Sequence, residues 1–229
     1  MGQQQVPFWN VNLPEEEWTE GCPEYLQRCT EREKMILGMP DSALEPLGWD
    51  AIKKIVHSSR IDDFRRKPSD HRRYKHYMHE LKAKYGSVAE FIRKKRLGWS
   101  PEDLDPNLTP FRRPEDIKVL YNDWPYLIHE KIVHLVVWTK FALPEDPDTG
   151  LLTEKSKEEI EDYMNSTFTM VDQSERIWFR NWRALKSIKS VEHFHVMLKN
   201  PDPRVIAEMT KGDVPMCKKV AEHGSASLL

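Results

Sequence analysis

Apolar residues recur with the period of an α-helix through the first half of the chain. The longest such segment, 68–86, begins at Pro-Ser, ends at glycine, and places Tyr74, Tyr77 and Leu81 on one side. Shorter segments with the same spacing lie at 24–37, 49–59 and 87–99. This pattern predicts that the N-terminal half of the protein is helical.

The second half of the chain carries patterns that are typical of β-strands. Residues 131–141 and 191–198 are rich in β-branched and aromatic side chains and lack a helical period, and 175–182 is a weaker strand candidate. Helical spacing returns at 153–172 and 202–209. We therefore predict an α+β fold, in which a helical N-terminal half packs on a small, mainly antiparallel β-sheet formed by the C-terminal half.

Length and composition favour one domain whose two terminal segments are loosely ordered. The chain has 229 residues, of which 39% are hydrophobic, and this is enough for one substantial core. We expect that core in a single α+β domain over residues 21–215. Residues 1–20 are polar and contain proline, so they are predicted to form a loosely ordered arm, and residues 216–229 a flexible tail.

Charge and cysteine content indicate an intracellular protein without a membrane partner. The net charge is −2, and the three cysteines, Cys22, Cys29 and Cys217, lack the spacing of a zinc site, as is typical of reduced thiols. We find no secretory signal and no apolar run of membrane-spanning length. A cytoplasmic location is expected, with the nucleus also compatible.

Residues 60–96 form a basic segment, with 13 Lys or Arg against 5 Asp or Glu. Such a run on a helix is usually a solvated face. Because the rest of the chain cancels this charge and no recognised nucleic-acid motif accompanies it, we expect no nucleic-acid partner.

Alternation along the two main strand candidates gathers chemically useful side chains on one face of each. His134, Trp138 and Lys140 share a face of the first candidate, and His193 and His195 share a face of the second. If the two strands are neighbours in one sheet, all five side chains face the same cleft.

The connection between these strands adds cations and an amide, namely Arg180, Asn181, Arg183 and Lys186. Arginine grips phosphate oxygens through its planar fork, lysine acts as a point charge, and an indole such as that of Trp138 or Trp182 stacks on a flat base. We therefore predict that the cleft binds a phosphorylated ligand, with phosphate held by Lys140, Arg180 and Lys186.

His193 and His195 are open to other interpretations. Two histidines on one strand face are often hydrogen-bonded sheet residues at the edge of a core. With His134 as a third ligand they would suit a divalent metal, which is the one cofactor that the sequence suggests. His-Phe-His-Val also resembles the His-x-His-x-His signature of histidine-triad nucleotide hydrolases and transferases, with Met197 in the third position. In that case His195 and His193 are catalytic.

The segment Asn-Asp-Trp-Pro-Tyr at 122–126 is a further candidate. Asn and Asp before Trp-Pro are typical of a structured turn, because their side chains bond the local backbone. The alternative is that Asp123 acts as a general base or ligand anchor beside His134.

Four motifs together resemble the fungal N-acetylglucosamine-induced protein family, a domain of unknown function. They are NDWPY (122–126), HLVVWTK (134–140), WFRNWRALKSIKSVEHFHVML (178–198) and KYGSVAEFIRKKRLGW (84–99). The resemblance runs from about residue 45 to 200. It implies a link to amino-sugar metabolism and supplies no reaction. Leu127 stands where the family pattern has glycine, which would allow a positive φ that leucine disfavours.

The residues and the resemblance together lead to one main expectation. Amino-sugar metabolism runs through uridine nucleotides, so a pyrimidine nucleotide or nucleotide sugar is the ligand that we expect in the cleft. One alternative is a phosphoesterase or nucleotide hydrolase that uses His193 and His195, either metal-assisted or of the histidine-triad type. The other is a regulatory scaffold without a small ligand.

Overall fold

A four-stranded antiparallel sheet forms the centre of the molecule. The computed structural model describes residues 6–181, 188 and 190–224. The strands are β1 (Ile117–Tyr121), β2 (Ile132–Thr139), β3 (Arg176–Phe179) and β4 (Glu192–Lys199). Their order across the sheet is β1-β2-β4-β3, and each neighbouring pair is antiparallel.

Helices dominate the first half of the chain, which confirms the predicted α+β fold. They are α1 (Glu24–Gln27), α2 (Glu31–Leu37), α3 (Trp49–His57), α4 (Pro68–Tyr85) and α5 (Val88–Phe91), which runs into a π-helical segment, Ile92–Leu97. The second half adds α6 (Glu154–Thr167), α7 (Pro203–Met209) and α8 (Met216–His223). Over the described residues, no helix combines the length and apolar character that crossing a membrane requires.

Local sequence signals explain where several helices begin and end. Thr30 caps α2 in a reciprocal pair with Glu33, and Thr153 caps α6 by accepting a backbone N–H. Helix α4 begins at Pro68, whose missing N–H suits the first helical turn. It ends at Gly86, where φ is 75° and a side chain would be strained.

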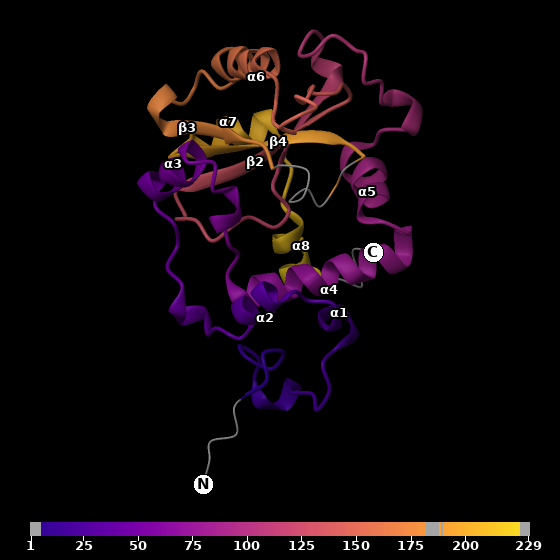
Figure 1. The fold of residues 1–229 in the computed structure, drawn as a ribbon, viewed down its shortest axis with the longest axis vertical. Helices are drawn as coiled ribbons and strands as arrows, with labels where there is room; N and C mark the ends of the chain where they lie inside the picture. Colours follow the sequence, from indigo (N-terminus) through magenta and orange to yellow (C-terminus); the bar gives the residue numbers. More distant parts are fainter. Residues whose placement is uncertain (1–5, 182–187, 189, 225–229) are drawn as a thin grey trace.

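The two faces of the sheet pack against different helices. On one face, Val137 and Phe194 share a hydrophobic core with Ile160 of α6. On the other face, Val136 and Trp138 share a core with α4, α5 and α8. Figure 1 shows this layering, with α6 above the sheet and α4 and α8 below it. The predicted alternation of side chains along β2 and β4 is therefore correct.

Strands β2 and β4 are direct neighbours, and their register brings the histidines together. Trp138 lies opposite His193, and His134 lies opposite Met197. His195 is two residues from each of these β4 positions, on the same face. The face that carries these side chains is the one that packs toward α4.

The described parts of both chain ends are held against the domain, which differs from the expected loose arm and flexible tail. Arg72 of α4 donates hydrogen bonds to the backbone carbonyls of Phe8 and Val11. At the other end, residues 216–223 form α8, and Met216 is buried in the core below the sheet. The domain therefore extends beyond the predicted limits of 21 and 215.

Candidate functional site

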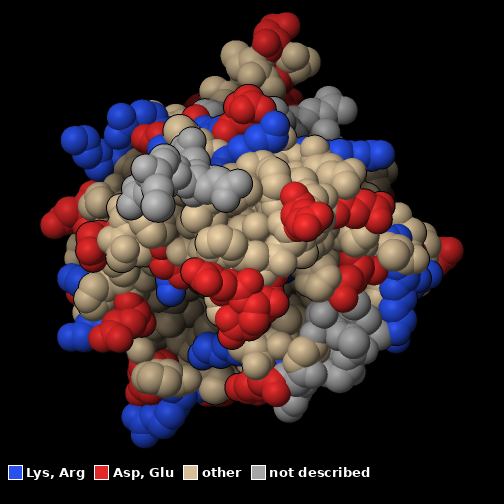
Figure 2. Space-filling model, turned by 90° about the horizontal axis from the view of Figure 1, so that it is seen from below, with Lys and Arg blue, Asp and Glu red and all other residues tan. Residues whose placement is uncertain are grey.

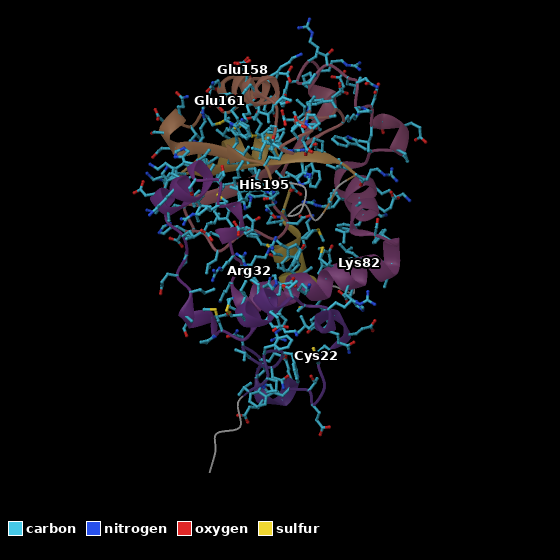
Figure 3. The ribbon with its side chains drawn as sticks, in the orientation of Figure 1. Cys22, Arg32, Lys82, Glu158, Glu161 and His195 are labelled. Carbon is cyan, nitrogen blue, oxygen red and sulfur yellow. The ribbon has the colours of Figure 1, made fainter. Side chains whose placement is uncertain are left out.

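A cavity of about 150 Å³ lies between the sheet and helices α4 and α5. The sheet contributes Val136, Trp138, His193 and His195 to its wall, and α4 contributes Tyr74, Tyr77 and Leu81. Figure 3 shows His195 on the side of the sheet that faces α4, whereas Glu158 and Glu161 of α6 lie on the opposite side. The structure thus brings the two histidines of β4 and the indole of β2 to one cavity.

His193 is held between an indole and the backbone. Its ring centre lies 4.5 Å from that of Trp138, with an interplanar angle of 31°. Its Nδ1 lies 2.9 Å from the carbonyl oxygen of Val191. Because a carbonyl oxygen only accepts, Nδ1 carries a hydrogen and donates it. This bond fixes the ring orientation of His193 at the cavity wall.

His195 joins an amide and a second histidine in a buried chain. The amide nitrogen of Asn181 lies 3.1 Å from Nε2 of His195, and Nδ1 of His195 lies 3.0 Å from Nε2 of His134. If Asn181 donates, Nε2 of His195 accepts and its Nδ1–H donates to His134. If the Asn181 amide is rotated by 180°, donor and acceptor exchange roles in both hydrogen bonds. The chain therefore couples the protonation of one histidine to that of the other.

The His134 side chain is held in its neutral form. Burial, together with the positive charge of Arg66, lowers the pKa of His134 from 6.5 to about 3. The ring stacks on Tyr126 with centres 5.3 Å apart. A neutral His134 offers no positive charge near pH 7, and it is linked to the cavity wall through its hydrogen bond to His195.

Three buried polar atoms of the cavity wall have no hydrogen-bond partner among the residues that the structure describes. They are Oη of Tyr77, Nε1 of Trp124 and Oδ1 of Asn181. Their residues are 1%, 3% and 8% exposed, respectively. Burial also raises the pKa of Tyr77, so its hydroxyl stays protonated and can donate. Because an unpartnered buried polar group is costly, a polar molecule that reached these atoms would remove that cost.

The cationic side chains of the cavity wall differ in how far they are neutralised. Arg96 bonds Asp123 and Asp213, each at 2.7 Å, so its charge is balanced by two carboxylates. Arg66 donates through Nε to the carbonyl oxygen of Trp124 at 2.8 Å, and its guanidinium lies over the Tyr74 ring at 4.2 Å. Among the described residues of the wall, Arg66 is thus the cation that forms no ion pair with a carboxylate.

Two of the predicted phosphate ligands, Lys140 and Arg180, do not line this cavity, which corrects their grouping with the histidines. Lys140 follows the end of β2, and its ammonium group lies 3.5 Å from Asp103. Arg180 bonds Glu192 and Glu145 at 2.9 and 2.6 Å. Since Phe179 lies beside His195, the next residue, Arg180, emerges on the opposite face of the sheet.

The remaining predicted residues divide into two groups. Arg183 and Lys186, together with Trp182, lie outside the described residues. Asp123 lies at the cavity wall, but its carboxylate already accepts bonds from Arg96 and from the backbone N–H of Met216. Asp123 ties α8 to the turn after β1 through these distant partners, whereas the local turn bond comes from Asn122, whose Oδ1 accepts from the Trp124 N–H at 3.0 Å. Among the described residues, no group of three His, Cys, Asp or Glu side chains has the arrangement of a metal site.

The basic segment 60–96 is interleaved with acidic partners. Ion pairs join Lys67 to Asp41 at 3.1 Å and Lys75 to Glu33 at 2.9 Å. Figure 2 shows Lys and Arg side chains scattered among Asp and Glu over the face seen there. That face does not offer the continuous basic surface that a nucleic-acid backbone requires.

The comparisons with known proteins give the family. The sequence family described as "Protein of unknown function (DUF3605)" matches residues 48–199, well over half of the chain. The chain belongs to this family. All four motifs that carried the resemblance fall inside the matched residues, and the family description names no activity.

Two fungal proteins and one solved structure are similar to this chain. N-acetylglucosamine-induced protein 1 of Candida albicans is 27% identical over 73% of this chain and 74% of its own length. An uncharacterized protein of Saccharomyces cerevisiae is also 27% identical, over 77% of this chain and 89% of its own. A structure described as "Crystal Structure of HTC1" has a TM-score of 0.50 and 26% identity, and covers 77% of this chain and 96% of that one. The predicted resemblance is therefore confirmed.

The backbone is not strained at Leu127, the position where the family pattern has glycine. Leu127 is not among the described non-glycine residues that have positive φ. Its N–H donates to the carbonyl oxygen of Arg65 at 2.7 Å, and its own carbonyl accepts from Leu47 at 3.0 Å. The turn after Asn-Asp-Trp-Pro-Tyr thus does not use the positive φ that glycine would allow at this position.

Sequence reasoning missed three residues of the site. Tyr77 was assigned to an apolar helix stripe, Arg66 to a solvated basic segment, and Trp124 to a turn. Each assignment describes the residue's local surroundings correctly. The signal that could have marked Tyr77 and Trp124 was the presence of hydrogen-bonding groups on side chains predicted to be buried.

Proposed function

We propose that the protein binds a phosphorylated small molecule in the cavity beside His193 and His195, in the cytoplasm. A nucleotide or nucleotide sugar is the ligand class, and pyrimidine nucleotides come first. The observation that carries the proposal is the cavity itself, in which Tyr77, Trp124 and Asn181 hold buried polar atoms without partners among the described residues. The Candida albicans relative, named for induction by N-acetylglucosamine, supports the link to amino-sugar nucleotides.

The position of the histidines also bears on the choice between a ligand site and a scaffold. A scaffold would pack the His193 and His195 face into a dry core. Instead both side chains line the cavity, next to the indole of Trp138. An aromatic face beside polar groups suits a ligand that combines a flat ring with hydrogen-bonding edges.

A thermal-shift screen tests the binding proposal. Uridine mono- and diphosphate, their sugar conjugates and other nucleoside phosphates are added at millimolar concentration. At about 100 times Kd, a ligand adds about 2.7 kcal/mol to the free energy of unfolding. For a domain of this size, that raises Tm by roughly 5 to 10 °C.

Two variants locate the site in the same assay. His195→Ala removes a side chain of the cavity wall and is expected to abolish the shift. Lys140→Ala serves as the matched control, because Lys140 lies beside Asp103 outside the cavity. Circular dichroism confirms that both variants fold. A screen in which no compound raises Tm, or in which His195→Ala responds like the parent, contradicts the proposal.

A phosphoesterase or nucleotide hydrolase is the second candidate, and the hydrogen-bonded chain from Asn181 through His195 to His134 favours it. Such a chain can position an imidazole and share its proton during attack on phosphorus. The ligand that binds is incubated with the protein, and phosphate or nucleoside monophosphate is measured. Loss of turnover on adding a chelator would identify the metal-assisted form, and turnover that resists the chelator, with a phosphorylated or nucleotidylated histidine detected by mass spectrometry, the histidine-nucleophile form. Bound ligand that stays intact assigns binding alone.

A further inference from the structure

The size of the cavity limits what it can enclose. Its volume of about 150 Å³ is that of a cavity that holds one benzene-sized ring. A complete nucleotide requires several times this volume. Pockets that enclose drug-sized ligands are usually larger than this cavity by a similar factor. The cavity therefore suits one part of a nucleotide, and a single ring matches this space better than the two fused rings of a purine.

The polar atoms of the wall specify the chemistry of that buried part. The Trp124 indole N–H can only donate, and the protonated Tyr77 hydroxyl donates as well. The Asn181 amide bonds His195 at one end, and its other end has no partner among the described residues. A ring that fills the cavity must hence carry acceptors for two donors and a polar edge for an amide. Carbonyl oxygens and an N–H on one ring meet this requirement.

The charges of the wall oppose burial of a phosphate. Arg96 is balanced by Asp123 and Asp213, and His134 is neutral. A phosphate in the interior would therefore lose its hydration beside the carboxylate of Asp123 without a balancing cation. Aromatic faces line the same space, including those of Trp138 and Tyr77, and they favour an uncharged flat ring.

Arg66 supplies the missing cation at the margin of the cavity. Its side chain is half-buried, whereas Tyr77 and Trp124 are almost fully buried. It rests on Tyr74 and lies 5.3 Å from the ring centre of Tyr126, and Nε is fixed by the Trp124 carbonyl. A guanidinium fixed in this way is prepared to pair with an anion that stays partly in water.

We infer that the cavity is a base pocket for a uracil-type pyrimidine, which hydrogen-bonds Tyr77, Trp124 and Asn181, and that the phosphate stays outside and pairs with Arg66. This inference rests on the proposed function and deepens it. It reverses the arrangement expected from the sequence, in which the histidine-lined cleft held phosphate.

Calorimetric titration of the full chain with parts of the ligand tests this arrangement. The probes are uridine, uridine 5′-monophosphate, ribose 5-phosphate, adenosine 5′-monophosphate and N-acetylglucosamine 6-phosphate. Uridine is expected to bind, and its monophosphate to bind about ten- to one-hundredfold tighter because of the charged hydrogen bonds from Arg66. Ribose 5-phosphate, the adenine nucleotide and the sugar phosphate are expected not to bind.

Two variants separate the base from the phosphate. Tyr77→Phe removes one donor and should weaken uridine about three- to tenfold, without lowering Tm, because the hydroxyl has no described partner in the free protein. Arg66→Gln should leave uridine unchanged and remove most of the advantage of the monophosphate. Tyr25→Phe on α1, outside the cavity wall, is the matched control and should change neither.

Each alternative result has a defined meaning. If ribose 5-phosphate binds as well as the uridine nucleotide and Tyr77→Phe has no effect, the base pocket is overturned while binding of a phosphorylated molecule stands. Binding of the sugar phosphate without uridine overturns the base pocket in favour of a sugar pocket. If no probe binds and the wider nucleotide screen is also silent, the proposed function fails together with the base pocket.

Discussion

Mild acid should destabilise the protein through His134 before its carboxylates protonate. His134 is 4% exposed, and burial together with Arg66 lowers its pKa to about 3, from 6.5 in an unperturbed histidine. Between these two values the unfolded chain binds a proton at this position that the folded protein does not bind. The free energy of unfolding therefore increases with pH up to about 6.5 and decreases as the pH falls below it.

The size of this effect follows from the pKa difference. Each pH unit below 6.5 removes about 1.4 kcal/mol, so moving from about pH 7.5 to about pH 5 costs about 2 kcal/mol through His134 alone. Burial lowers the pKa of His71 to about 4, which adds a second contribution of the same sign. Carboxylates such as Asp41, whose pKa is lowered by its bonds to Ser69 and Lys67 against the effect of burial, stay ionised over this range.

Urea unfolding at several pH values between 7.5 and 5 isolates the His134 contribution. The parent protein, His134→Gln and the exposed control His57→Gln are compared. His71 is present in all three, so its contribution cancels in the differences. The parent and the control should lose about 2 kcal/mol more than His134→Gln across the range. Equal losses in the parent and His134→Gln would refute the account of His134 as a buried neutral base.

Three further predictions concern the supports of the fold and are measured by urea unfolding near pH 7. Replacing Arg96 by methionine leaves the carboxylates of Asp123 and Asp213 without their cation, and should cost about 3–5 kcal/mol; a loss below about 1 kcal/mol would show that the pair is solvated. Leu127→Gly should cost about 1 kcal/mol, because φ is not positive there and glycine only gains freedom in the unfolded chain; a stabilised variant would contradict this. Thr153→Ala should cost about 1 kcal/mol by removing the cap of α6, whereas Thr153→Ser should be nearly neutral.

The sequence predicted the strands of the site because their period is a property of the backbone. A residue's side along β2 or β4 depends only on whether its position is odd or even, so Trp138 and His193 could be placed without a structure. The short edge strand β1 went unpredicted, because only Leu120 of its five residues is buried and no alternation is visible. Helix α8 was missed because its burial depends on a bond from the Met216 N–H to a distant aspartate.

The partners of charged side chains could not be predicted, because they depend on tertiary register. Arg180 is one residue beyond β3, and its side of the sheet follows from the pairing of Phe179 with His195. Without that register, a guanidinium near two histidines looks like a phosphate ligand. The structure instead pairs it with Glu192, which directly precedes His193 in β4 and therefore lies on the opposite face of the sheet from the histidines.

The relocation of these cations changes the kind of ligand that the site selects. If Lys140, Arg180 and Lys186 had surrounded the phosphate, affinity would come mainly from charge, and any phosphorylated molecule of suitable size would compete. In the described part of the site, Lys140 and Arg180 are already paired with carboxylates, and Arg66 alone faces the margin of the cavity as an unbalanced cation. One charged contact gives little selectivity among phosphates, so discrimination must come from the enclosed ring. Under the proposed base pocket, Tyr77 and Trp124 would decide which nucleotide binds, and Arg66 would decide how strongly its phosphate contributes.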